Sequence, residues 1–375
     1  MKIAIFHFNP LELYPPATNF LECLEKTLPK NTSIKIFTLA LESGHMVFKL
    51  ESHNFQIVRL GKSTKGSLPI GRYFQYFKYY FLSILKCIQW KPDKVLYFES
   101  LSALPVYVLM KLFKGIEVFA HFHEYMTPQE YKRMWLNEKI YALEKRSILP
   151  KAVWISHTNI DRLDMFLKDR EIMFNKSKHH IFPNYPPKSW LKKPAERQLS
   201  TPISFVYVGS FSSLDKLYIK EVLAWMMSLH KKATLDVYSF NIPDKVRNYV
   251  KSLKSAVVTL HEAQKYSNLS GIIARYDIGL IIYSATEKNV VYSAPNKLFE
   301  YLSCGLDVWY PKEMIGCHTH NSETYWPKVV PLDFNRLYEI NFNELVSRKA
   351  NKSRVINFTC EAASKPLIDR LMHHD

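Results

Sequence analysis

The most constraining feature of the sequence is the segment from Tyr276 to Pro311, which reads YDIGLIIYSATEKNVVYSAPNKLFEYLSCGLDVWYP. Two apolar runs in it, Ile278–Tyr283 and Val308–Tyr310, predict short buried strands. A compact helix is predicted between the runs, because Pro295 suits a first helical turn and Gly305 suits a helix end. The segment therefore predicts a strand–helix–strand unit of an α/β fold.

The polar residues of the predicted helix follow a helical spacing. Ser293 or Ala294 is the predicted cap at its start. Asn296, Lys297 and Glu300 lie three and four residues apart, so they share one face, separate from the apolar positions. This places an amide, an ammonium and a carboxylate together near the helix start.

Such a helix start suits a nucleotide. Its backbone N–H groups and the positive end of the helix dipole attract a diphosphate, and Lys297 adds a positive charge there. Glu300, one turn deeper, can accept two charge-assisted hydrogen bonds from ribose hydroxyls. The alternative is an ordinary solvated polar face on a helix of an α/β domain.

The run SAPNKLFEYLSCGLDV resembles the nucleotide-binding motif of GT-B glycosyltransferases, in particular the large family 4-like group. The resemblance implies that Glu300 binds the ribose of a nucleotide-sugar donor, with Ser293, Asn296 and Lys297 also contacting the donor. Tyr292 stands where the family has a further acidic residue. No DxD motif occurs, which fits a transferase of this fold that works without metal or other cofactor.

Strand and helix patterns alternate along the whole chain and restart after a proline-rich, charged linker at 184–202. With the resemblance, this predicts an α/β GT-B fold of two doubly wound, Rossmann-like parallel-sheet domains facing a cleft. The expected domains are an acceptor-binding domain at 1–190 and a nucleotide-sugar-binding domain at 191–375. In this family the last helix commonly returns to the first domain, and we expect the same here.

The restart point is VYVGSF, residues 206–211, which is similar to the segment that opens the donor domain of GT-B enzymes. The similarity implies that Gly209 and Ser210 approach the donor. Lys216 and Lys220 lie near the place where the family often has a basic pair that binds the diphosphate.

A second polar motif, AHFHEY at 120–125, ends a predicted strand of the first domain. Ligands of α/β folds bind beyond the carboxyl ends of parallel strands, and His123 and Glu124 can hold a substrate hydroxyl or take its proton. The motif resembles the HEYF segment of some bacterial GT-B glycosyltransferases, which implies a catalytic role, with Glu124 the nearest base if the enzyme inverts. The alternative is a His and a Glu satisfied within the loop. The following TPQE predicts a helix with a capping box between Thr127 and Glu130.

Charge indicates an anionic partner. The formal net charge is +17, and residues 1–190 hold 27 basic against 16 acidic residues. A predicted helix at 71–91 carries Lys and Arg among apolar residues at helical spacing: Phe74, Phe77, Phe81, Leu85 and Ile88. We expect this stripe to pack on the sheet, as most such stripes do. The alternative is contact with an anionic membrane surface.

The five cysteines are scattered without a CxxC pair, which indicates reduced thiols. The start MKIAIFHF enters a strand directly, and no run approaches the roughly 20 apolar residues needed to span a bilayer. These features predict a cytoplasmic protein, soluble or peripheral on the inner face of the membrane. Cys317, His318 and His320 form a small cluster that can ligate metal, but they lack a second cluster, so no metal site is predicted.

Two functions of different classes follow. The first is metal-independent transfer of a sugar from a nucleotide-diphosphate sugar to a hydroxyl of a glycan or lipid-linked acceptor, in bacterial surface polysaccharide synthesis. The second is a non-catalytic, basic surface- or nucleic-acid-binding protein on the same fold, although no nucleic-acid-binding module is recognisable, so a nucleic-acid partner is not expected. A nucleotide-sugar epimerase of similar architecture is a third option.

Overall fold

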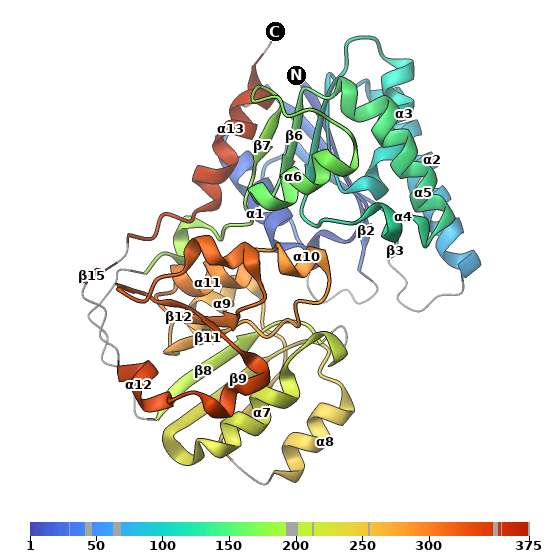
Figure 1. Cartoon of the computed structure of the whole chain (residues 1–375). Coiled ribbons are helices and arrows are strands. Elements are labelled where there is room, and N and C mark those ends of the chain that lie inside the picture. Colours follow the sequence, from blue (N-terminus) through green and yellow to red (C-terminus); the bar gives the residue numbers. More distant parts are fainter. Residues whose placement is uncertain are drawn as a thin grey trace. The chain divides into compact units, whose positions relative to one another are not determined.

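The computed structural model describes residues 1–29, 31–41, 47–62, 69–192, 202–211, 214–253, 256–347, 352–353 and 355–373. It divides into two compact α/β units (Figure 1). The first contains Met1–Asn184 and the returning segment Cys360–Asp375, and the second contains Tyr185–Thr359. The division falls at 184/185 rather than 190/191, because Tyr185 and Trp190 already pack in the core of the second unit.

The first domain is built on a parallel sheet of seven strands in the order β3-β2-β1-β4-β5-β6-β7. Its strands are β1 (Lys2–His7), β2 (Ser33–Ala40), β3 (Phe55–Lys62), β4 (Lys94–Phe98), β5 (Glu117–Phe122), β6 (Trp154–His157) and β7 (His179–Ile181). Its helices are α1 (Pro15–Thr27), α2 (Pro69–Trp90), α3 (Ala103–Leu112), α4 (Pro128–Lys132), α5 (Trp135–Leu143), α6 (Ile160–Asp169) and α13 (Cys360–Met372). Strands β4 and β5 are buried on both faces and consist mostly of apolar residues, as is usual for central parallel strands.

The second domain repeats this plan with six parallel strands in the order β10-β9-β8-β11-β12-β14. Its strands are β8 (Ile203–Val208), β9 (Ala233–Tyr238), β10 (Val258–His261), β11 (Ile278–Leu280), β12 (Asp307–Pro311) and β14 (Val329–Leu332). Its helices are α7 (Ile219–Ser228), α8 (Asp244–Ser252), α9 (Tyr266–Ile273), α10 (Lys288–Val291), α11 (Asn296–Ser303) and α12 (Phe342–Ser347). A further pair of short strands is β13 (Tyr325–Trp326) and β15 (Lys352–Ser353).

The last helix, α13, belongs to the first domain, where it lies beside α1 (Figure 1). Leu367, Ile368 and Leu371 join the apolar core between α1 and the sheet. The first domain is therefore completed by a helix that follows the second domain in the sequence.

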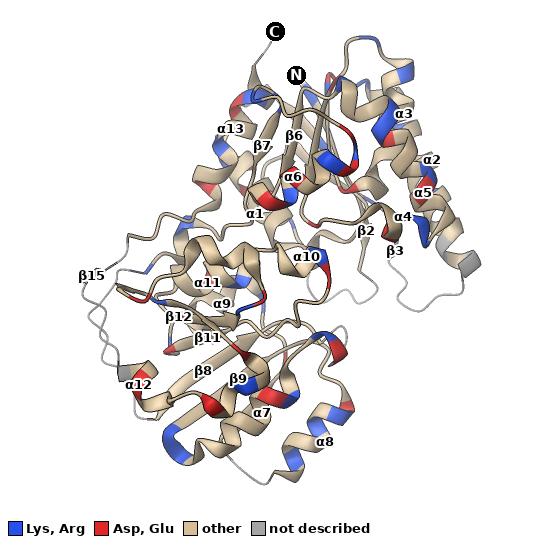
Figure 2. Cartoon of the chain, viewed as in Figure 1, with Lys and Arg blue, Asp and Glu red and all other residues tan. Residues whose placement is uncertain are grey.

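Charged residues lie mainly on the helices and loops of both domains, while the strands are mostly uncharged (Figure 2). All five cysteines are buried. No helix among the described residues is both long and apolar enough to cross a bilayer.

Helix α2 contradicts the expectation that its apolar stripe packs on the sheet. Phe74, Phe77 and Phe81 are 68%, 65% and 54% exposed, and Leu85 and Ile88 are exposed too. The helix instead buries another face, which consists of Tyr79, Tyr80, Ser83 and Cys87. The helix is apolar on two faces, and periodicity alone does not show which one meets the sheet.

A buried ion pair joins the turn after α5 to the end of α6. Glu144, on a π turn at Glu144–Ile148, accepts hydrogen bonds from Tyr97 Oη at 2.9 Å and from Arg170 Nη2 at 3.1 Å. Both ionic side chains are at most 1% exposed. The Arg170 guanidinium also lies 3.8 Å from the centre of the Phe166 ring, a cation–π contact.

We expect Glu144→Ala to lower the free energy of unfolding of the first domain by about 3–5 kcal/mol, because it leaves the Arg170 charge buried without its counter-ion. Urea denaturation measures the loss. The control is Lys365→Ala, which breaks the exposed pair with Asp369 and costs at most about 0.5 kcal/mol. A loss below about 1 kcal/mol for Glu144→Ala would contradict this account.

Candidate active-site residues

In the second domain, the predicted nucleotide helix is α11, and its start differs from the prediction. Pro295, not Ser293 or Ala294, is the cap residue, and it makes no side-chain hydrogen bond to the helix. Ser293 is buried, and its carbonyl oxygen lies 3.5 Å from Cys317 Sγ. Because Pro295 offers no side-chain hydrogen bond to α11, the first-turn N–H groups of this helix suit an anion.

Lys297 and Glu300 form a buried pair on α11 rather than part of an exposed face. Lys297 Nζ lies 2.8 Å from Glu300 Oε2, and the other carboxylate oxygen accepts from Tyr266 Oη at 3.3 Å. The Glu300 side chain is 2% exposed and that of Lys297 is 17% exposed. Burial lowers the pKa of Lys297, but the attraction of the Glu300 carboxylate outweighs burial and raises the pKa above its usual range. Lys297 is therefore held charged, and the contact orients both side chains.

Close packing against β11 positions α11. A Cβ on Gly279 would lie 2.3 Å from the Tyr301 ring, so only glycine allows the helix to approach the strand this closely. The Tyr301 hydroxyl accepts the Val208 N–H at 3.0 Å. This hydrogen bond ties α11 to the end of β8, directly before Gly209.

Gly209 and Ser210 form the turn after β8, and contacts with Tyr207 and Asn241 fix its conformation. A Cβ on Gly209 would lie 2.4 Å from the Tyr207 hydroxyl. Ser210 Oγ accepts from Asn241 Nδ2 at 3.1 Å, and the Phe211 N–H donates to Asn241 Oδ1 at 2.9 Å. Gly209 and Ser210 thus lie at the carboxyl edge of the sheet, where β8 meets β9.

Lys216 lies in an exposed ion pair of the second domain. Its Nζ lies 2.7 Å from Glu287 Oε1, and both side chains are more than a third exposed. Leu217 forms a β-bridge with Tyr283, so the segments following β8 and β11 lie side by side. An anion that binds Lys216 would first have to displace Glu287 from this ion pair.

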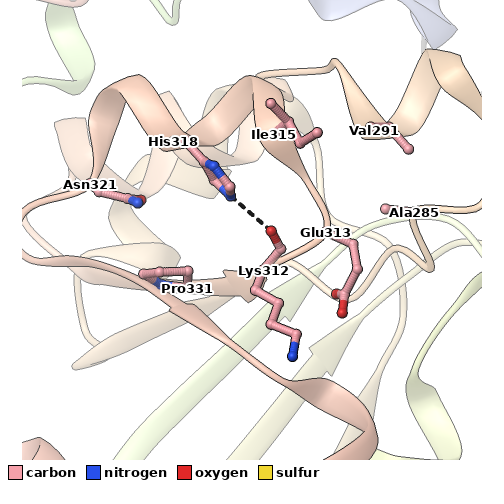
Figure 3. Close-up of a pocket in the computed structure, with 8 residues that line it drawn as sticks. All are labelled: Ala285, Val291, Lys312, Glu313, Ile315, His318, Asn321 and Pro331. Atoms are coloured by element: carbon pink, nitrogen blue, oxygen red, sulfur yellow. Dashed lines mark hydrogen bonds between the residues drawn. The ribbon is translucent and has the colours of Figure 1, made fainter.

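A cavity of about 620 Å³ opens at the carboxyl ends of β12 and β14 (Figure 3). Its volume falls within the usual range for small-molecule sites. Its polar side chains are Lys312, Glu313, His318 and Asn321, and His318 Nε2 lies 2.8 Å from the Lys312 carbonyl oxygen. The residues that line it include none of the predicted donor-binding residues, although it borders Val291, close before α11.

The side chains of the Cys317, His318 and His320 run have other partners. His318 is engaged with Lys312, and the His320 ring packs against the rings of Phe299 and Phe358. Within the part of the chain that the structure describes, no three His, Cys, Asp or Glu side chains gather as a metal site would require.

In the first domain, His123 directly follows β5 and is buried. Its Nδ1 lies 3.0 Å from Asn184 Oδ1 and 3.2 Å from His121 Nε2, and its ring stacks on Phe98. Burial, with repulsion from His7, lowers the pKa of His123 to about 3. His123 is therefore neutral at physiological pH and suits hydrogen bonding to a substrate better than proton removal.

Glu124 is exposed and lines a second, smaller cavity together with Glu99, a residue that the sequence reasoning did not select. Glu99 Oε1 accepts the backbone N–H groups of His123 and Glu124 at 2.6 and 3.2 Å. Its position in the sequence could have identified Glu99 as a candidate, because it follows Phe98, the last residue of the apolar strand β4. A polar residue at such a strand end lies at the binding edge of a parallel sheet.

Comparison with solved structures identifies the fold. The chain matches the apo form of the lipopolysaccharide outer core galactosyltransferase WaaB with a TM-score of 0.63 and 15% identity over 99% of this chain and 100% of that one. It matches a sucrose-phosphate synthase from Thermosynechococcus elongatus with a TM-score of 0.65 and 14% identity, over 100% of this chain and 95% of that one. It also matches a UDP-GlcNAc 2-epimerase from Methanocaldococcus jannaschii with a TM-score of 0.58 and 12% identity, over 100% of both chains. No protein-family model and no curated protein sequence matches the chain. The predicted two-domain GT-B fold of glycosyltransferases is confirmed.

We expect Gly279→Ala to destabilise the second domain by about 1–3 kcal/mol, because the new methyl group overlaps the Tyr301 ring. The matched control is Gly271→Ala in α9, where a Cβ meets open space and helix propensity favours alanine by up to about 1 kcal/mol. Thermal unfolding of both variants measures the difference. Equal stability of the two would show that α11 is not held by this contact.

Proposed function

We propose that the protein is a metal-independent glycosyltransferase. It moves a sugar from a nucleotide-diphosphate sugar to a hydroxyl of a glycan or lipid-linked acceptor, and its role is in bacterial surface polysaccharide synthesis. The observation that carries the proposal is the buried Lys297–Glu300 pair on α11, in a GT-B fold, within a motif resembling that of family 4-like enzymes.

The donor site in this proposal lies around α11. Glu300 accepts the ribose hydroxyls, exchanging its hydrogen bond from Tyr266 for ligand donors. The uncapped helix start and Lys297 stabilise the diphosphate, whose charge grows as it leaves. The remaining donor contacts come from the α11 start and the turn after β8: Ser293, Asn296, Gly209, Ser210 and Lys216.

The first domain supplies the acceptor side. His123 and Glu124 follow β5 at the carboxyl edge of the sheet and hold the acceptor hydroxyl or the donor sugar. His123 offers a neutral ring, and its Nε2 atom is buried without a hydrogen-bond partner among the described residues. Glu124 offers an exposed carboxylate beside a cavity.

A nucleotide-sugar epimerase is the second candidate, since a UDP-GlcNAc 2-epimerase shares the fold. The two activities differ in product: a transferase releases nucleoside diphosphate in proportion to a new glycoside, whereas an epimerase returns an altered nucleotide sugar. A non-catalytic basic binding protein does neither.

We expect the purified protein to release nucleoside diphosphate from one member of a panel of UDP- and GDP-sugars, faster with an acceptor glycan than without. The panel also includes CMP-sugars, from which a transferase would release CMP. Chromatography of nucleotides and sugars follows the reaction. An altered nucleotide sugar without release would favour the epimerase, and intact donors throughout would leave only a binding role.

We expect Glu300→Ala to weaken binding of the nucleoside diphosphate by about 2–4 kcal/mol, since a charge-assisted pair of hydrogen bonds is lost. Titration calorimetry measures the affinity. The control is Glu262→Ala, which removes an exposed carboxylate of the same domain and should leave the affinity unchanged. Unchanged affinity in a folded Glu300→Ala protein would remove this carboxylate from the donor site.

Helix α2 supports the further proposal that the protein works at an anionic membrane surface on the cytoplasmic side. Its stripe of Phe74, Phe77 and Phe81 is exposed, and Lys78 and Lys86 on the same helix are exposed too. An amphipathic helix with aromatic and basic residues binds anionic lipid through both apolar burial and charge. The surplus of basic residues in 1–190 favours the same partner.

We expect the protein to float with phosphatidylglycerol-containing vesicles and to detach as salt rises, because salt screens the lysines. The double variant Phe77→Ser, Phe81→Ser should lose this binding while staying folded, since both rings are exposed. Phe240→Ser, at an exposed ring of the second domain, is the control. Equal flotation with neutral and anionic vesicles would contradict the proposal.

A further inference from the structure

The cavity of about 620 Å³ in the second domain is not used by the proposed donor chemistry (Figure 3). It lies at the carboxyl ends of β12 and β14, which are neighbouring parallel strands. This edge of a parallel sheet is where α/β folds bind their ligands. All the residues that line the cavity belong to the second domain, so the space is complete within one compact unit.

Three of the polar side chains that line the cavity already have partners within the protein. Lys312 Nζ lies 2.6 Å from Asp333 Oδ2. His318 Nε2 donates to the Lys312 carbonyl oxygen at 2.8 Å, and Asn321 Oδ1 accepts from the Tyr310 hydroxyl. The hydrogen-bonding capacity of these groups is therefore used largely inside the domain.

The fourth polar side chain of the cavity, that of Glu313, is different. Its carboxylate makes no hydrogen bond or ion pair with the residues that the structure describes, and its Oε2 atom is shielded from solvent. A carboxylate that is partly removed from water without a partner is costly. The residue is half-buried and lines the cavity, so a ligand in the cavity can reach the carboxylate.

The charges around Glu313 favour a positive ligand. The hydrogen bond between Lys312 and Asp333 raises the pKa of the lysine and lowers the pKa of the aspartate, so both are ionised and their charges cancel. Arg336, which also acts on Asp333, is offset by Glu339 at 3.9 Å. The Glu313 carboxylate therefore leaves one net negative charge at the cavity, and a cation beside it is attracted.

The remaining walls of the cavity are apolar. They consist of the side chains of Ala285, Val291, Ile315 and Pro331, and Ile315 is 44% exposed. A ligand with a hydrocarbon body would remove this surface from water, which favours binding. The volume is sufficient for a compact organic molecule.

The segment after β12, which forms one wall, is held by hydrogen bonds of its own. Cys317 Sγ donates to the Ser293 carbonyl oxygen at 3.5 Å, and the Cys317 N–H donates to Met314 O at 3.0 Å. The Asn321 N–H donates to His318 O at 3.1 Å. The wall is therefore formed before a ligand arrives, which lowers the entropic cost of binding.

We propose that this cavity is a second ligand site and that it binds a small organic cation, a primary ammonium group on a compact hydrocarbon body. The ammonium donates a charge-assisted hydrogen bond to the Glu313 carboxylate, and the body packs against Val291, Ile315 and Pro331. A divalent metal ion fits less well, because it takes roughly six oxygen ligands and Glu313 is the only carboxylate among the described residues that line the cavity. The site shares no residue with the proposed donor site, so the inference does not depend on the proposed function.

The test uses the purified chain and three probes of similar shape: cyclohexylammonium, cyclohexanol and cyclohexanecarboxylate. Methyl NMR follows the Ile315 signal, which is assigned as the one missing from Ile315→Val. We expect cyclohexylammonium to shift this signal saturably, with a dissociation constant on the order of 1 mM for its roughly seven heavy atoms. Cyclohexanol should bind about tenfold or more weakly, because it lacks the charge, and cyclohexanecarboxylate should leave the signal unchanged.

Substitutions at the two charged lining residues should act in opposite directions. Glu313→Gln should weaken binding of cyclohexylammonium by about tenfold or more, since it removes the charge that the ammonium meets. Lys312→Gln should strengthen binding by about threefold, since it removes a neighbouring positive charge at an exposed position. Glu262→Gln, at an exposed carboxylate of the same domain, is the matched control and should bind like the wild type. A general loss of structure cannot produce both changes.

The inference would be overturned by equal affinity for cyclohexanol and cyclohexylammonium, or by unchanged affinity in Glu313→Gln. Absence of a saturable shift of the Ile315 signal up to about 20 mM probe would overturn it too. Preference for cyclohexanecarboxylate would assign the cavity to an anion instead. No sugar donor or acceptor enters the experiment, so its failure leaves the proposed glycosyl transfer standing, and an inactive transferase leaves the cation site standing.

Discussion

Parallel strand pairing is the constraint on which both candidate sites depend. In a parallel sheet every strand ends at the same edge, so residues that directly follow different strands come together although they are distant in sequence. Asn9, Glu99 and Glu124 meet in this way in the first domain. In the second domain the same rule brings the segments after β8 and β11 side by side.

The Glu144–Arg170 pair of the first domain and the Lys297–Glu300 pair of the second have different surroundings. Glu144 and Arg170 are fully enclosed by tyrosine, serine and phenylalanine side chains, so they fix the loops behind the first cavity. Lys297 and Glu300 are buried at the start of α11, where Lys297 keeps some exposure. Desolvating such charges is costly unless each has a partner, and a pair at an uncapped helix start can exchange its partner for a ligand.

Two features of the first domain are unusual: the backbone conformation of Glu99 and the exposed aromatic side chains of α2. Glu99 has an unfavourable backbone conformation, and it follows β4, where the strand order of the sheet reverses. Helix α2 leaves Phe74, Phe77 and Phe81 largely exposed. Large exposed apolar patches on a folded domain commonly mark a surface that another molecule covers.

The sequence by itself determined the fold class, the alternating elements and the local signals. The Thr127–Glu130 capping box forms as predicted, and PNKLFEYLSCG forms the helix between β11 and β12. These features depend on neighbours within a few residues, which a sequence pattern records directly. Only the tertiary structure decided that Glu300 is buried against Lys297, that the apolar stripe of α2 is exposed, and that Glu99 faces the first-domain cavity. Those outcomes depend on which face of a helix meets the sheet and on which strands become neighbours, and both are set by packing between residues far apart in the chain.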